Sequence, residues 1–165
     1  MQQAEQFELW IAEHRAIFHH AVNAFASNPA DRDDLMQEVL LAVWKAIPQF
    51  QGASRASTFV YRVSHNSAMT WSRTRSNYRR MLGQVAVQSM PQLTKPATAS
   101  SDEIIERLYA RIREFSPFDR SLLLLWLDEV SYREMAEIHG IAENLVGVRL
   151  TRARARLIEE MKEQE

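Results

Sequence analysis

Apolar residues in the first half of the chain recur at the three- and four-residue spacing of helices that pack on a core. Residues 7–26 carry one such stripe, which predicts a single helix that ends at Asn28-Pro29. A second stripe predicts a helix over residues 31–47, with inward positions at Leu35, Val39, Ala42, Val43 and Ile47. We expect Asp31, followed by Asp34, to cap this helix, because acidic side chains suit the positive end of the helix dipole.

A glycine-containing loop at 49–54 separates this helix from a third one, which Ser57 or Thr58 can begin and which runs toward Tyr78. Residues 83–101 then have no sustained period, two prolines and many small polar residues. This composition predicts a flexible linker.

The second half restarts with a helical stripe at residues 104–112. Ser116 and Ser131 each have an acidic residue three positions later, the pattern of a helix start. Gly140 suits a left-handed turn after the helix that Ser131 begins, and a last helix is expected over 143–161. Two short helices joined by a tight glycine turn predict a helix-turn-helix.

The predicted fold is therefore all-α, with two small helical domains on a flexible linker. Residues 1–82 form a bundle of three or four helices, residues 83–102 form the linker, and residues 103–165 form the helix-turn-helix domain.

Composition excludes several classes of site. The chain has 165 residues and no cysteine, so a disulfide framework, a thiolate metal site and a cysteine nucleophile are excluded. His14, His19 and His20 have no partners at metal-ligand spacing and are expected on helix surfaces. No phosphate-binding loop or catalytic triad stands out, so we predict no catalytic residue, metal or cofactor. The chain starts without a signal-peptide pattern and lacks a membrane-length apolar run, so we expect a cytoplasmic protein with no membrane insertion.

The net charge is −1 at pH 7, but the charges are unevenly distributed. Four acids lie within residues 31–38, and no Asp or Glu follows until Asp102. The intervening segment carries several arginines and aromatic residues. An acidic surface beside a basic one is thus expected.

Two segments carry a family resemblance. DRDDLMQEVLLAVWKAIPQFQG with TFVYRVSHN resembles the second conserved domain of bacterial sigma factors of the extracytoplasmic-function (ECF) group, and SPFDRSLLLLWLDEVSYREMAEIHGI with VRLTRARARL resembles their fourth. The resemblance implies a non-enzymatic protein that binds core RNA polymerase through the β′ clamp helices and the β flap. It also implies promoter recognition, opening of the −10 region and control by an anti-sigma factor.

The resemblance assigns polymerase docking to Asp34, Gln37, Glu38 and Leu41, with Trp44 as an anchor at the lower edge. The spacing of the first four residues places them on one helix face. The alternative is an ordinary solvated helix surface with a core tryptophan.

The acid-free segment fits a single-strand binder, because cations follow phosphates and rings stack on unpaired bases. By resemblance, the loop before the third helix forms a pocket for one flipped −10 base, and Asn66 lines the same site. Arginines of the segment are expected on phosphates. The predicted −10 contacts are Phe50, Gln51, Ser54, Arg62, His65, Asn66, Arg73 and Arg75.

The last helix is expected to enter the major groove at the −35 element. The predicted contacts are Glu143, Asn144, Gly147, Val148, Arg149, Arg152 and Arg156. Gly147 and Val148 depart from the family pattern and remove two direct base contacts, so Val148 on a thymine methyl and Asn144 on adenine are expected instead.

Two alternatives remain open. One is a helix-turn-helix regulator that binds duplex DNA without polymerase. The other is a degenerate sigma-like module that sequesters an anti-sigma factor and no longer reads a promoter.

Overall fold

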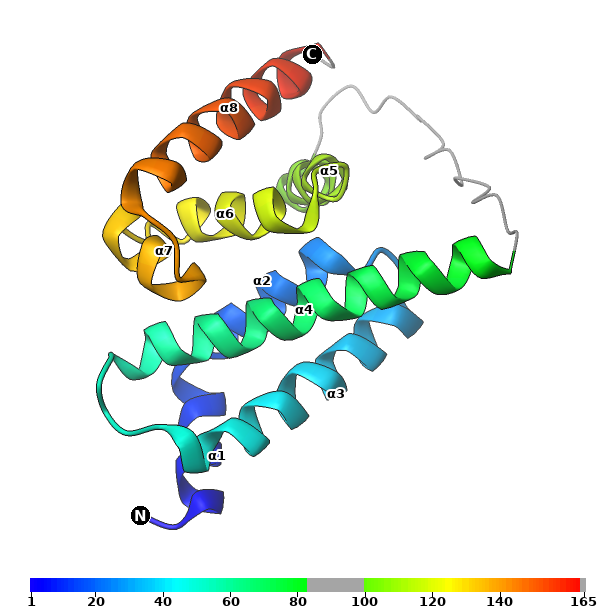
Figure 1. Cartoon of the computed structure of the whole chain (residues 1–165). Coiled ribbons are helices and arrows are strands. Elements are labelled where there is room, and N and C mark those ends of the chain that lie inside the picture. The colour runs from blue at the N-terminus through cyan, green and yellow to red at the C-terminus, as the bar shows by residue number, and fades with distance from the viewer. Residues whose placement is uncertain (83–99, 164–165) are drawn as a thin grey trace.

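The computed structural model describes residues 1–82 and 100–163, which are helical throughout except for short connections, with no strand in either range (Figure 1). The elements are α1 Gln3–Glu13, α2 Arg15–Phe25, α3 Pro29–Ala46, the short 3₁₀ turn η1 Ile47–Gln49, α4 Ala56–Met81, α5 Ser101–Ile112, α6 Pro117–Leu127, α7 Tyr132–His139 and α8 Glu143–Lys162. We call residues 1–82 the N-terminal half and residues 100–163 the C-terminal half. Residues 83–99, most of the predicted linker, lie outside the described residues, and the last positions of the predicted linker already belong to α5.

The apolar stripe at residues 7–26 forms two helices rather than the single predicted one. The chain turns at His14, where φ is −114° and ψ is 21°. The two helices share some partners and differ in others. Trp10 of α1 packs against Phe50 and against Phe59 of α4, with ring centroids 5.1 and 5.7 Å away, and α2 packs against α3 and α4 and also against α5 and α6. The sequence stripe did not reveal the turn because both helices are apolar on one face.

The predicted starts of α3 and α4 are also corrected. Asn28 caps α3: its side-chain oxygen accepts a hydrogen bond from the backbone N–H of Asp31 at 2.9 Å, and Pro29 occupies the first turn. Asp31 is therefore inside the helix and not its cap. Helix α4 begins at Ala56, without a side-chain cap, and continues beyond Tyr78 to Met81.

The caps of the C-terminal half are confirmed. The hydroxyls of Ser116 and Ser131 accept hydrogen bonds from backbone N–H groups three residues later, at 3.3 and 3.2 Å. Gly140 closes α7 in the left-handed conformation, with φ of 64°. Helices α7 and α8 thus form the predicted helix-turn-helix.

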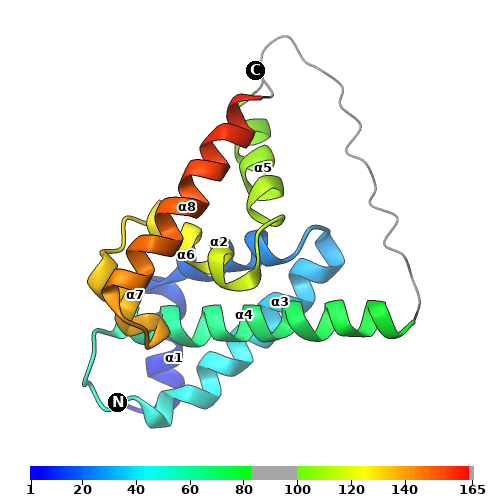
Figure 2. The same cartoon turned by 45° about the horizontal axis from the view of Figure 1, so that its top comes forward.

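Helix α4 lies between α3 on one side and α6 and α7 on the other (Figures 1 and 2). Buried apolar residues of both halves belong to one continuous cluster, in which Leu35, Val60, Leu122 and Leu125 are fully covered. The two halves are therefore folded together. The long helix α4 packs against α2 and α3 of its own half and against α6 and α7 of the C-terminal half.

Candidate functional site

The predicted docking residues of α3 share one exposed face. Asp34, Gln37, Glu38 and Leu41 are exposed, because Leu35, Val39 and Val43 direct the opposite face into the core. We call these four residues the acidic face. Leu41 is 47% exposed, a large fraction for an apolar side chain. Among the described residues, no salt bridge involves Asp34 or Glu38, so both carboxylates are available to a partner.

Trp44 is half-buried at the end of this face. Its ring meets Phe7 of α1 edge-on, with centroids 5.3 Å apart and planes at 81°, and its carbonyl oxygen accepts a hydrogen bond from the Gln3 side chain at 2.8 Å. Helix α1 therefore supports the ring on one side and leaves part of it accessible.

Asp31 ties the start of α3 to the end of α4. Its carboxylate is buried and pairs with Arg75 at 2.5 Å and with Arg79 at 3.7 Å. The Arg75 guanidinium also lies 5.3 Å from the centroid of the Trp71 ring. Arg75 was predicted to contact DNA phosphate; in this structure its charge is already partnered.

Of the −10 contacts predicted in the loop before α4, two are accessible to solvent and one packs against the protein. Gln51 is exposed and Ser54 is half-exposed. Phe50 packs against Trp10 and Phe59, each with a centroid distance of 5.1 Å, so it forms the floor of the loop. Gly52 has φ of 72°, which other residues rarely adopt.

The predicted −10 residues of α4 are divided between two environments. Asn66 and Arg73 lie seven residues apart on the exposed side of the helix. Arg62 donates a hydrogen bond to the carbonyl oxygen of Glu137 in α7 at 2.8 Å, and His65 is 1% exposed with Nδ1 at 2.6 Å from Ser121 Oγ of α6. In this arrangement His65 is covered by the C-terminal half, so the predicted contact between His65 and DNA does not fit it.

The start of α8 is exposed at Glu143, Asn144 and Val148. Gly147 is half-exposed beside the Tyr132 ring, and a Cβ at position 147 would lie 3.7 Å from that ring. Helix α7 thus lies directly behind the start of α8 and supports it.

Two of the three arginines predicted on α8 have partners in the C-terminal half. Arg149 pairs with Asp119 at 2.9 Å and lies over Phe118, and Arg156 pairs with Glu160 at 2.6 Å and lies over Phe115. Arg152 is exposed, and no salt bridge within the described ranges involves it.

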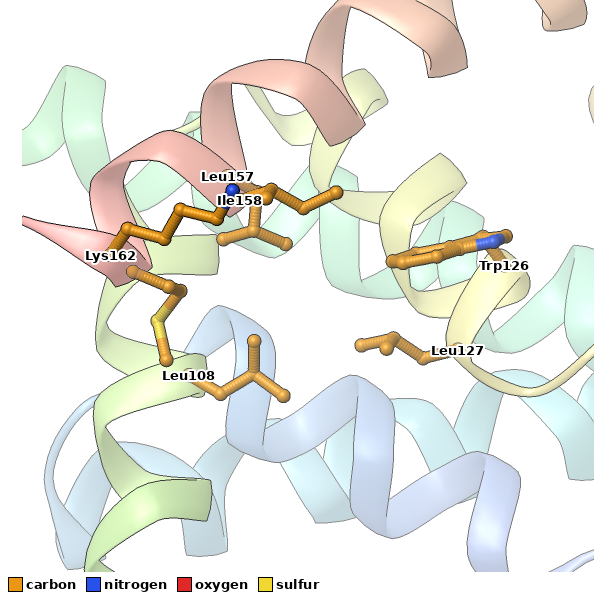
Figure 3. A pocket seen from close by; sticks show the side chains of 7 residues that line it. Leu108, Trp126, Leu127, Leu157, Ile158 and Lys162 are labelled. Carbon is orange, nitrogen blue, oxygen red and sulfur yellow. The ribbon is translucent and has the colours of Figure 1, made fainter.

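Sequence reasoning missed an apolar groove between α5, α6 and α8. It encloses about 300 Å³, and Figure 3 shows the side chains around it. The lining residues are Leu108, Trp126, Leu127, Leu157, Ile158, Met161 and Lys162. Exposed Ile104 and Ile105 precede Leu108 on α5. The signal was present, because α5 and α8 each carry more apolar residues than one core-facing stripe needs.

Neither a metal site nor a membrane span is found in the part of the chain that the structure describes. No group of three or more His, Cys, Asp or Glu side chains there could hold an ion, and no described helix is long and apolar enough to cross a bilayer. His20 is not a plain surface residue as predicted, because its Nδ1 lies 2.7 Å from a carboxylate oxygen of Asp128 in the other half.

The chain matches two regions of one family of transcription proteins. Residues 10–78 match sigma-70 region 2, and residues 105–157 match sigma-70 region 4. The first segment contains the acidic face and most of α4, and the second contains the helix-turn-helix.

Two curated relatives are RNA polymerase sigma factors. The chain is 25% identical over 144 residues to a probable RNA polymerase sigma factor, RfaY, of Xanthomonas campestris pv. campestris, with 84% of this chain and 36% of that protein covered. It is 29% identical over 152 residues to the ECF RNA polymerase sigma factor SigG of Mycobacterium tuberculosis, with 77% of this chain and 41% of that protein covered. The chain thus spans less than half the length of these relatives.

Two solved structures share the fold over nearly the whole chain. One is CnrH in complex with the cytosolic domain of CnrY, with a TM-score of 0.68, 20% identity, and coverage of 98% of this chain and 91% of that one. The other is the sigma factor RpoE in complex with the anti-sigma factor NepR from Bartonella quintana, with a TM-score of 0.73, 20% identity, and coverage of 94% and 95%. Since both regions occur in the order found in sigma factors, on a fold that a solved sigma factor shares, the protein belongs to the ECF group of the sigma-70 family.

Proposed function

We propose that this protein is a sigma factor that binds core RNA polymerase, directs it to specific promoters and helps to open the −10 region. The observation that carries the proposal is the position of the acidic face on α3 beside the basic, aromatic helix α4, with a helix-turn-helix in the other half. It acts in the cytoplasm and as a binding protein rather than an enzyme. Its two domains are residues 1–82 and the helices from Ser101 onward, and the linker between them ends where α5 begins.

Polymerase is bound at two surfaces. The acidic face binds the β′ clamp helices, because its carboxylates have no ion-pair partner in the described ranges. Exposed Leu41 adds apolar contact, and Trp44 is of a residue type that is enriched at interface hot spots. The groove between α5, α6 and α8 takes the β flap, because an open apolar groove suits the apolar face of a helix.

The −10 strand is bound on α4 and the loop before it. Gln51, Ser54 and Asn66 supply polar groups that can read a base edge, and Arg73 supplies a cation for phosphate. Stacking returns about 1–3 kcal/mol per captured base, which offsets the few kcal/mol needed to unstack a step.

The −35 element is read by the first turns of α8. Asn144 and Val148 are exposed there, so an amide can meet adenine and a methyl-bearing side chain can meet thymine. Arg152 is the arginine proposed for a phosphate contact, since Arg149 and Arg156 already have carboxylate partners.

An anti-sigma factor is the proposed regulator. RpoE of Bartonella quintana is bound by the anti-sigma factor NepR, and the present chain has the fold of that sigma factor over 94% of its length. This likeness supports a partner of the same class here.

The experiment is a pull-down of core RNA polymerase by the purified chain, followed by transcription from genomic promoters of the host. We expect a stable complex and transcripts that start at a subset of promoters. Lack of polymerase binding, together with duplex DNA binding, would show a regulator of the first alternative kind. Binding of an anti-sigma factor without transcription would show the sequestering module.

A further inference from the structure

The arginines near the end of α4 lie on two opposite sides of the helix. Because an α-helix turns by about 100° per residue, Arg73 and Arg80 lie within about 40° of Asn66 around the helix axis. Arg75 and Arg79 lie about 180° and 140° away from Asn66. We call Asn66, Arg73 and Arg80, which are all exposed, the exposed row, and Arg75 and Arg79 the opposite row.

The opposite row faces the start of α3. It continues the side of α4 that buries Val60, Ser64 and Ala68 in the core, and the end of α4 runs past the start of α3 (Figures 1 and 2). The acid at this place is Asp31, whose carboxylate lies 2.5 Å from Arg75 and 3.7 Å from Arg79. Two cations therefore share one carboxylate.

The carboxylate of Asp31 is held firmly in this position. Asp31 is only 4% exposed, and the side-chain amide of Asn28 donates a hydrogen bond to its Oδ2 at 2.9 Å. The backbone N–H of Asp31 also donates to Asn28 Oδ1, so backbone and side chain are both fixed. Asp31 is thus a fixed anion beside the opposite row.

The arginines that it pairs with are accessible to solvent. The side chain of Arg75 is 39% exposed and that of Arg79 is 49% exposed, so a phosphate could reach either one. Carboxylate and phosphate are alternative partners of the same guanidinium group, which binds both through paired N–H donors. Asp31 therefore occupies donors that nucleic acid would otherwise use.

The exposed row has no such partner. Within the described ranges no salt bridge involves Arg73 or Arg80. The sequence has no Asp or Glu between Glu38 and Asp102, so the segment that follows α4 carries no carboxylate side chain for them either. The positive charge that α4 offers to phosphate is consequently concentrated on the side that carries Asn66.

We propose that Asp31 is a specificity-determining residue, which occupies the opposite row in place of phosphate so that nucleic acid binds the end of α4 only along the exposed row. A strand on the exposed row lies where Asn66 can read a base, whereas a strand on the opposite row would be bound without being read. This consequence rests on the proposed function. The effect of the charge can be tested on the free protein, without polymerase.

The first experiment compares Asp31→Asn with Asp33→Asn in the full-length protein. Asp33 is exposed and two residues away, so its substitution makes the same change in net charge. Binding of a labelled oligothymidylate, which contains no promoter sequence, is followed by fluorescence anisotropy at several salt concentrations. Each additional phosphate contact steepens the plot of log affinity against log salt by about 0.7 for a single strand.

We expect Asp31→Asn to steepen this plot by about 0.7 to 1.4, for one or two added contacts, and to raise the affinity about fivefold or more at low salt. Asp33→Asn should leave the slope unchanged. Adding Arg79→Gln to Asp31→Asn should reverse part of the gain, because the added contacts are made by the opposite row. An unchanged slope for Asp31→Asn, with its helix content intact, would overturn the proposal.

A second pair of variants keeps Asp31 and so does not depend on the stability of Asp31→Asn. Arg79→Gln and Arg80→Gln remove neighbouring exposed cations, one from each row. We expect Arg80→Gln to reduce the slope by about 0.7 and Arg79→Gln to leave it unchanged. Equal losses in the two variants would show that Asp31 does not keep Arg79 from phosphate, and the proposal would be wrong.

The consequence for transcription is tested with core polymerase and a host promoter. Excess oligothymidylate should inhibit transcription with Asp31→Asn at lower concentrations than with Asp33→Asn. Equal inhibition would exclude Asp31 from a role in specificity. If the original protein does not support transcription at all, the proposed sigma function is wrong, and the anisotropy measurements still decide whether Asp31 blocks the opposite row.

Discussion

Gly147 lies in the second turn of α8, where a side chain would have room. A Cβ added there would meet only the Tyr132 ring at 3.7 and 3.8 Å, an ordinary contact. Gly140 is different, since its φ of 64° is a conformation that other residues rarely adopt, although nothing lies within 4 Å of its Cβ position.

This contrast predicts opposite effects of the same substitution. Gly147→Ala should raise the free energy of unfolding by about 0.5–1 kcal/mol, because glycine loses more conformational freedom in a helix than alanine. Gly140→Ala should lower it by about 1 kcal/mol, because alanine is strained in the left-handed region. Urea unfolding followed by circular dichroism measures both. A Gly147→Ala protein that is less stable than the original would show that position 147 cannot accommodate a side chain.

Features that depend on neighbouring residues, such as helix caps, could be predicted from the sequence, whereas features that depend on distant residues could not. Ser116, Ser131 and Gly140 act through groups within four residues of themselves, so their caps were predicted correctly. Asp31 was misassigned as a cap because Asn28 offers the same chemistry one turn earlier. The covering of His65 depends on Ser121, which is 56 residues away, and no local pattern indicates it.

At the scale of elements, α3 and α4 are joined by a buried carboxylate. Asp31→Ala should lower the free energy of unfolding by about 1–3 kcal/mol, because it removes the buried carboxylate that pairs with Arg75 and Arg79. The matched control is Asp33→Ala, two residues away and exposed, which should change it by less than about 0.5 kcal/mol. Equal effects in urea unfolding would contradict the structural role of Asp31.

Substitutions in the acidic face should weaken binding to core polymerase and leave the fold intact. Asp34→Lys with Glu38→Lys should abolish binding to core polymerase in a pull-down, since like charges would replace attractive ones at the interface. Circular dichroism should remain unchanged because both side chains are exposed. Glu13→Lys with Glu159→Lys makes the same charge change at other exposed positions and should retain binding. Retained binding in the acidic-face variant would exclude these residues from docking.

Periodicity predicted α3 and α5 to α8 well because each has one strongly apolar side or clear caps. It predicted one helix where α1 and α2 are two, since both helices are apolar on one face and no proline or glycine marks the turn at His14. The acidic face followed from spacing alone. The groove and the shared core did not, because both need helices from distant parts of the chain.

At the scale of the whole molecule, docking of the halves should depend on pH. The pKa values of His65 and His139 are lowered by burial to about 3 and 4, whereas separated halves would titrate near 6.5. His65 is also faced by His139 and His20, which lower its pKa, and by Asp128, which raises it. Between about pH 6.5 and pH 4 the docked form therefore binds fewer protons, and docking weakens as the pH falls.

His20 acts in the opposite direction. Its hydrogen bond to Asp128 raises its pKa, so its contribution is present below pH 6.5 and is lost as the pH rises through the raised value. Protonation of His65 and His139 opposes docking, whereas protonation of His20 favours it through the pair with Asp128. Because two histidines oppose docking and one favours it, we expect the two halves to separate as the pH falls.

The distance between the halves can be measured between two spin labels, attached at Thr74→Cys of α4 and Ala155→Cys of α8, which are exposed positions. The distribution of this distance should broaden between about pH 7.5 and pH 5. A distribution that stays narrow at the lower pH would contradict this balance.

The four tryptophans are distributed so that each reports on a different place. Trp44 borders the acidic face, Trp71 lies beside Arg75 on α4, Trp126 lines the groove under Arg154, and Trp10 is in the core. Intrinsic fluorescence of variants that retain one indole at a time would therefore follow the occupancy of each surface in solution, without any added dye.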